Sequence, residues 1–141
     1  MSEFDGSLQS THVTHGALTK LTDALTRYFD LMHTCNVDAF ATVFLPTVTL
    51  HGFRDGQLVA WSAEVYKDIL RKRESPQSRG ASRADEILLI DFASTTQAFT
   101  KVRVKISELL FVDYLTWHFV DGEWLISSKG FHLEASDRLL R

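Results

Sequence analysis

Residues 112–132 read "VDYLTWHFVDGEWLISSKGFH", and this stretch decides the fold. Two runs of alternating apolar and polar side chains flank Asp121-Gly122, a pattern typical of a β-hairpin with a tight turn. A two-residue turn places Val120 opposite Glu123, and cross-strand partners point to the same face of the sheet. The stretch therefore predicts two long antiparallel strands whose side chains sort onto two distinct faces.

One face of this hairpin is apolar near the turn and polar at the other end. The polar end brings Asp113, Ser128 and His132 around Gly130, which has no side chain and leaves space. This gradient is typical of the floor of a pocket, because ligand pockets combine apolar walls with a few polar groups. The hairpin therefore predicts a semi-enclosed pocket that Asp113 faces.

A second register is also compatible with Asp-Gly, namely a three-residue loop with a glycine bulge. Asp113 would then pair with Lys129 at the surface, since a slip of one residue moves a whole strand's side chains to the other face. The inward polar groups would become Tyr114, Thr116, His118 and Ser128. The first register separates apolar from polar side chains better and is preferred, while the second stays open.

The rest of the chain predicts an α+β domain in which three N-terminal helices precede a meander of strands. Apolar residues recur every three or four positions from Ala17 to about Cys35, which predicts a long amphipathic helix. A short helix follows from Asp38, and Ser62 is a good N-cap for a third helix that extends to about Arg73. Alternation with period two predicts strands at about residues 47–53, 57–61, 85–93, 97–107, 110–120 and 123–133.

Length, charge and cysteine content limit the class of protein. A chain of 141 residues suits one domain, which we expect at residues 15–141 after a polar, mobile arm at residues 1–14. A net charge of −3 argues against nucleic acid as the main partner, since phosphate binding needs a basic surplus. The single cysteine, Cys35, fits a reducing compartment, and the longest aliphatic run, Ile87–Ile90, is too short to cross a bilayer. We expect a cytoplasmic protein without membrane contact.

The chain resembles the nuclear transport factor two-like superfamily over about residues 17–134. The resemblance rests on "YFDLMHTCNVDAFATVFLP" at residues 28–46, on the hairpin at residues 112–132 and on the order of elements between them. Within the superfamily the chain is most similar to the polyketide-cyclase-like and "putative lumazine-binding" group. The resemblance implies a strongly curved, mainly antiparallel sheet wrapped around a long helix, a cone-shaped, cystatin-like fold with a pocket at its wide end. It also implies homodimers formed through the outer sheet face.

Asp113 is the main candidate for chemistry, because a carboxylate in an apolar pocket has a raised pKa and can transfer protons. Ketosteroid isomerases of the superfamily use a carboxylate base with a tyrosine and a second acid. Tyr28 or Tyr114 matches the tyrosine, but these strands supply no second inward acid, which argues against isomerase chemistry. A hydrogen-bonded structural role for Asp113 remains the alternative.

Histidine and tryptophan residues supply the other candidates. His132 lies diagonal to Asp113 in the preferred register, where it is a second possible base, and His51 precedes a hairpin that can face the same mouth. Trp61, Trp117 and Trp124 are candidates for stacking on a planar ligand or for the core.

No metal or other cofactor is expected. His118 and His132 fall on opposite faces in the preferred register and therefore do not converge on a metal. The sequence lacks the glycine-rich strand-to-helix turn that binds nucleotide cofactors.

Three functions follow from these observations. The first is a homodimer that binds a small, partly apolar molecule, with the stripe of Phe99, Lys101, Arg103 and Lys105 on the outer, subunit-facing side of the sheet. The second is a proton-transfer enzyme, an isomerase, cyclase or dehydratase, with Asp113 or His132 as general base. The third is a protein-binding adaptor. We prefer the first, and the sequence leaves open whether the chain is an enzyme.

Overall fold

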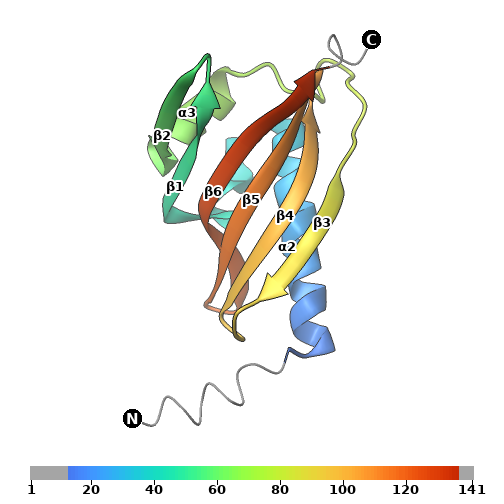
Figure 1. The fold of residues 1–141 in the computed structure, drawn as a ribbon, viewed down its shortest axis with the longest axis vertical. Helices are drawn as coiled ribbons and strands as arrows, with labels where there is room; N and C mark the ends of the chain where they lie inside the picture. Colours follow the sequence, from blue (N-terminus) through green and yellow to red (C-terminus); the bar gives the residue numbers. More distant parts are fainter. Residues whose placement is uncertain (1–12, 137–141) are drawn as a thin grey trace.

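The computed structural model describes residues 13–136, which form one curved sheet with helices on its concave face (Figure 1). The elements are α2 (His15–Thr34), the 3₁₀ helix η1 (Val37–Thr42), β1 (Phe44–Arg54), β2 (Gln57–Ser62), α3 (Ala63–Lys72), β3 (Glu86–Phe92), β4 (Gln97–Ile106), β5 (Leu109–Val120) and β6 (Glu123–Ser136). This is the predicted α+β fold, and all six predicted strands are present. The predicted arm at residues 1–14 lies almost wholly outside the described residues.

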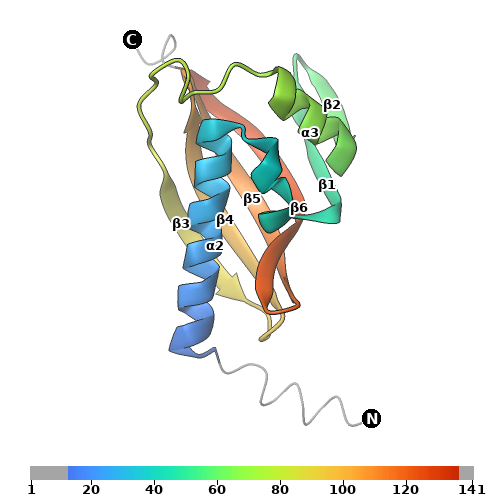
Figure 2. The ribbon, with the colours of Figure 1, turned by 180° about the vertical axis from the view of Figure 1, so that it is seen from behind.

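The six strands follow the order β2-β1-β6-β5-β4-β3. All neighbours are antiparallel except β1 and β6, which run parallel. Seen from behind, α2 lies along the concave side of β4 to β6, while η1 and α3 lie on the side of β1 and β2 (Figure 2). The sheet therefore wraps around one long helix, and the helices leave its convex face uncovered.

The helix boundaries follow from local capping. Thr14 begins α2 by accepting a hydrogen bond from the backbone N–H of Ala17. Cys35 ends α2 in the left-handed conformation, with φ of 55°, and Asn36 then caps η1 through the N–H of Asp38. The second predicted helix is thus a 3₁₀ helix that ends before β1. No helix within residues 13–136 is long and apolar enough to cross a membrane.

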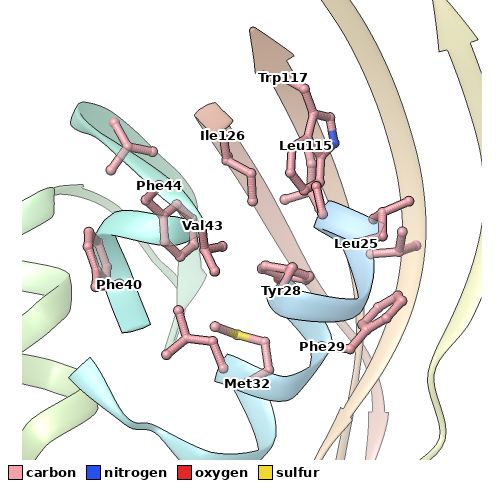
Figure 3. Packing of buried hydrophobic residues seen from close by; sticks show 14 of the residues in the cluster. Leu25, Tyr28, Phe29, Met32, Phe40, Val43, Phe44, Leu115, Trp117 and Ile126 are labelled. Carbon is pink, nitrogen blue, oxygen red and sulfur yellow. The ribbon is translucent and has the colours of Figure 1, made fainter. Parts of the chain in front are cut away.

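The core lies between α2 and the sheet, as the spacing of apolar residues in α2 predicts. The inward face of α2 carries Leu25, Tyr28 and Met32 against β5, β6 and the aromatic residues around η1 (Figure 3). Trp117 and Trp124 are fully buried near the β5–β6 turn. Their indole rings therefore fill the end of the fold next to this turn.

The β5–β6 hairpin has the predicted register only near its turn. Val120 pairs with Glu123 and Trp117 pairs with Ile126, as expected for a two-residue turn. The next pair is Thr116 with Ser128, so the register shifts at a β-bulge that leaves one extra residue on β6. Beyond this bulge neither predicted register gives the observed pairing, in which Asp113 lies opposite Phe131.

The bulge decides which residues of β6 face the helices. Past it, Lys129 and Phe131 lie on the concave side, where Lys129 is buried. Ser128, Gly130 and His132 turn to the convex side, which corrects the prediction that they surround Asp113 on the inner face. The bulge thus replaces a predicted serine and histidine beside Asp113 with a lysine and a phenylalanine.

Candidate functional site

A cavity of about 390 Å³ opens at the end of the sheet away from the β5–β6 turn. The turn between β1 and β2, the end of α3 and the turn between β4 and β5 surround it, at the upper end of the molecule in Figure 1. Its lining residues are Phe53, Arg54, Asp55, Trp61, Tyr66, Arg73, Ile106, Leu109, Phe111, Asp113, Lys129, Phe131 and Leu133. Mostly apolar walls with a few polar groups at this size are typical of a small-molecule site.

Asp113 supplies the buried acid of this cavity, and its side chain is only 1% exposed. The Tyr28 hydroxyl donates a hydrogen bond to Oδ2 of Asp113, and Nζ of Lys129 lies 3.7 Å from the same oxygen. The other oxygen, Oδ1, is buried and has no hydrogen-bond partner among the described residues. The carboxylate is therefore held through one oxygen while the second is left without a donor.

Lys129 is held from several sides beside Asp113. Its ammonium donates to Oη of Tyr66 at 3.2 Å and lies 3.6 Å from Sδ of Met32. Nζ also lies 5.1 Å from the ring centroids of both Tyr28 and Tyr66. Cation–π contacts of this kind stabilise a desolvated ammonium. Lys129 is thus a positioned positive charge at the floor of the cavity.

Tyr28 is a hydrogen-bond donor at this site. Burial raises the pKa of Tyr28 well above its usual range, and the negative charge of Asp113 raises it further. The tyrosine therefore keeps its proton at neutral pH and donates a hydrogen bond to the carboxylate.

Arg73 is a second cation in the cavity wall. It follows the last residue of α3, and its Nη1 is buried without a hydrogen-bond partner in the described part of the chain. Burial raises the pKa of the Cys35 thiol, whereas the charge of Arg73 and its hydrogen bond with the thiol oppose that rise. Arg73 also opposes the rise in the pKa of Tyr28. The guanidinium therefore lies close to the buried polar cluster but retains a free donor.

Stacked aromatic rings form one wall of the cavity. The ring of Trp61 stacks on Tyr66 at 5.9 Å between centroids and on Phe131 at 5.2 Å. Phe131 in turn lies over Gly52 of β1, where a Cβ atom would be 2.4 Å from the phenyl ring. Only a glycine leaves room for this ring. The absence of a side chain at Gly52 thus allows the ring of Phe131 to pack against β1 and form part of this wall.

The structure brings together only part of the predicted site. Asp113 and Trp61 line the cavity, and Tyr28 bonds to Asp113 from behind. His51 and His132 are exposed and line a separate hollow on the convex face of the sheet. The expected proximity of His132 to Asp113 is therefore wrong.

The two remaining tryptophans lie outside the cavity. Trp117 and Trp124 are core residues at the other end of the fold, and neither lines the cavity. Nε1 of Trp117 donates to the Thr100 hydroxyl at 2.9 Å, so its polar group is used within the core. These two residues follow the core alternative of the sequence analysis.

Among the polar residues of the cavity that the sequence analysis did not assign to a site are Tyr66, Arg73 and Lys129. Lys129 carried a signal, because one of the two registers already paired it with Asp113, although at the surface. Tyr66 has no such signal, and Arg73 marks only the approximate end of the third predicted helix. Within residues 13–136 no group of three or more His, Cys, Asp or Glu side chains is placed to hold a metal ion.

Several solved structures have this fold. A nuclear transport factor two-like protein of unknown function from Shewanella baltica has a TM-score of 0.77 at 20% identity, over 89% of this chain and 100% of that one. A cystatin-like fold protein from Burkholderia xenovorans has a TM-score of 0.67 at 16% identity, over 86% and 95% of the two chains. A ketosteroid isomerase-like protein from Erwinia carotovora atroseptica has a TM-score of 0.68 at 12% identity, over 86% and 99%. At these identities the likeness shows the fold alone.

Sequence comparison identifies the family directly. No curated protein matches the chain. A family profile described as "Putative lumazine-binding" matches residues 17–132. This range includes α2 from its third residue, the sheet as far as His132 and every lining residue of the cavity except Leu133. The chain therefore belongs to this family, and its fold is that of nuclear transport factor two-like proteins.

Proposed function

We propose that this protein binds a small, partly apolar molecule in the cavity between α3 and the β1–β2 and β4–β5 turns. One observation carries the proposal: Asp113 is buried in the cavity with Oδ1 unpartnered among the described residues. Buried polar atoms are almost always hydrogen-bonded, because an unsatisfied one costs about 1–3 kcal/mol. A ligand that donates a hydrogen bond to Oδ1 removes this cost.

The walls support a partly apolar ligand. Phe53, Ile106, Leu109 and Phe111 line the cavity together with the stacked rings of Trp61 and Phe131. Apolar ligand surface in contact with these walls leaves water, which contributes roughly 25 cal/mol per Å². The volume of about 390 Å³ limits the ligand to the size of a small metabolite.

Native mass spectrometry of the purified protein tests this proposal, with a variant whose cavity is filled. Ile106→Trp places an indole in the cavity wall, and Leu18→Trp places one on the exposed part of α2 as a matched control. We expect a retained small molecule, or fragments bound in ligand-observed NMR, with wild type and Leu18→Trp but not with Ile106→Trp. Equal binding by Ile106→Trp would place the ligand elsewhere and contradict the proposal.

Proton transfer with Asp113 as general base is the second candidate function. Oδ1 of Asp113 supports this candidate as well. Tyr28 and Lys129 hold Oδ2, which leaves Oδ1 to accept a proton from a substrate C–H or O–H group. The ketosteroid isomerase-like neighbour supports this candidate through its fold only. His132 is exposed on the other face of the sheet and does not line the cavity, which leaves Asp113 as the candidate base.

Hydrogen exchange distinguishes catalysis from binding. The molecule retained by the protein is incubated with wild type and with Asp113→Asn in D₂O, and its acidic C–H positions are followed by NMR. A general base accelerates proton transfer by about 10²- to 10⁴-fold, so the rate of exchange with Asp113→Asn should be lower by that factor. Exchange at an equal rate with both proteins would exclude Asp113 as the base.

We also propose a homodimer formed through the convex face of the sheet. Tyr114 and Leu89 are both half-exposed there, and the ring of Phe99 packs on Tyr114 at 5.5 Å. The ammonium of Lys101 lies 5.7 Å from the same tyrosine ring. Aromatic residues rimmed by charges are typical of subunit interfaces.

A cytoplasmic location is proposed as well, because Cys35 is a buried free thiol.

A further inference from the structure

The charges inside the cavity do not balance. Arg54 and Asp55 at the β1–β2 turn contribute one charge of each sign. Apart from this turn, the lining residues Lys129 and Arg73 are positive, and Asp113 is the only other acid in the described lining. One positive charge is therefore left over in a largely apolar space.

The surplus belongs to Arg73 and not to Lys129. Nζ of Lys129 lies 3.7 Å from Oδ2 of Asp113 and already donates to Tyr66. Nη1 of Arg73 is buried, and none of the described residues accepts a hydrogen bond from it. An arginine remains charged at any physiological pH, so this group cannot reduce its cost by losing a proton.

We propose that the ligand is a small organic acid whose carboxylate binds Arg73 and whose hydrocarbon part lies along the stacked Trp61 and Phe131 rings. This inference rests on the proposed function and narrows it to one chemical class. A guanidinium presents a planar fork of donors that matches a carboxylate. The carboxylate supplies the one negative charge that the lining of the cavity lacks.

The same geometry assigns a second polar group to the ligand. Tyr28 donates to Oδ2 of Asp113 and Lys129 lies beside that oxygen, so Oδ1 is the carboxylate oxygen left to accept a hydrogen bond. The ligand therefore carries a hydroxyl or N–H group apart from its carboxylate. A phosphate monoester fits less well, since it brings nearly two negative charges to a single surplus positive charge.

Matched acids and amides test the charge requirement directly. The probes are the pairs 4-hydroxybenzoate and 4-hydroxybenzamide, 4-hydroxyphenylacetate and 4-hydroxyphenylacetamide, and 3-(4-hydroxyphenyl)propionate and its amide. Dissociation constants are measured by ligand-observed NMR for wild type, Arg73→Gln and Arg73→Lys. Arg71→Gln is the control, since Arg71 is an exposed residue on the same helix and does not line the cavity.

We expect the acids to bind about 10- to 100-fold more tightly than their amides to wild type and Arg71→Gln. Arg73→Gln should lose this preference, and Arg73→Lys should keep part of it because the charge remains. Thermal unfolding of each variant confirms that it is folded. Equal binding of acids and amides to wild type, or a preference that survives in Arg73→Gln, would overturn the inference. Amides that bind while acids do not would leave the proposed function standing, whereas no binding by any probe in the three pairs would count against both.

Discussion

Tyr28 on α2 and Asp113 on β5 are 85 positions apart in the sequence and share a buried hydrogen bond. This bond ties the long helix to the sheet at the floor of the cavity. Because the tyrosine occupies Oδ2, the other carboxylate oxygen remains for a ligand. The pair is therefore both part of the core and part of the candidate site.

Tyr28→Phe should destabilise the protein at pH 7 by about 1.5–3 kcal/mol, since it removes a hydrogen bond to a charged group. The pH dependence follows from the raised pKa of Tyr28. Above pH 10 unfolded Tyr28 loses its proton while folded Tyr28 keeps it, so the wild type loses stability as pH rises further. Urea unfolding from pH 8 to 11 measures the free energy of unfolding of wild type and Tyr28→Phe. The difference between these two free energies should become smaller above about pH 10. The same narrowing with Tyr114→Phe, a half-exposed tyrosine on the convex face, would argue against Tyr28 as the source.

Lys129→Met should destabilise the protein by about 3–5 kcal/mol, because it leaves the charge of Asp113 buried without its cation. Adding Asp113→Asn should recover part of this loss, since the double variant has no buried charge at the pair. Chemical denaturation of the two single variants and the double variant gives the coupling energy. Lys72→Met removes an exposed pair with Asp68 and should leave unfolding unchanged. Strictly additive effects of the two cavity substitutions would contradict a coupled pair.

Gly52→Ala should destabilise the protein by about 1–3 kcal/mol, because the new methyl group would collide with the ring of Phe131. The displaced ring should also weaken binding at the cavity, which the NMR probes report. Gly130→Ala is the matched control on the neighbouring strand, where the nearest atom lies at an ordinary 3.9 Å. Similar losses for the two alanines would mean that backbone flexibility, and not contact with Phe131, explains the result.

Tyr114→Glu should convert the proposed homodimer into a monomer, since it places a charge at the centre of the convex face. Size-exclusion chromatography with light scattering measures the mass directly. Leu18→Glu, on an exposed part of α2, should keep the mass of the wild type. A wild-type protein that is monomeric throughout the micromolar range would refute the proposed interface.

The sequence predicted most of the fold because its signals are local. The spacing of apolar residues in α2, the N-cap at Ser62 and the Asp121-Gly122 turn each act over a few residues, and each is found as predicted. The preferred hairpin register also placed Asp113 inward, where it is buried, whereas the alternative register placed it at the surface. These features need no information about distant parts of the chain.

Tertiary structure alone decided which residues surround Asp113. Ser127 and Ser128 are small polar residues that suit either face of a sheet, so alternation gives no sign of an extra residue between Ile126 and Lys129. That residue moves His132 outward and Lys129 inward. Arg73 reaches the cavity only because α3 packs beside β1 and β2, a placement that depends on contacts between distant segments. Local patterns thus determined the elements, whereas long-range packing selected the cations beside the buried acid.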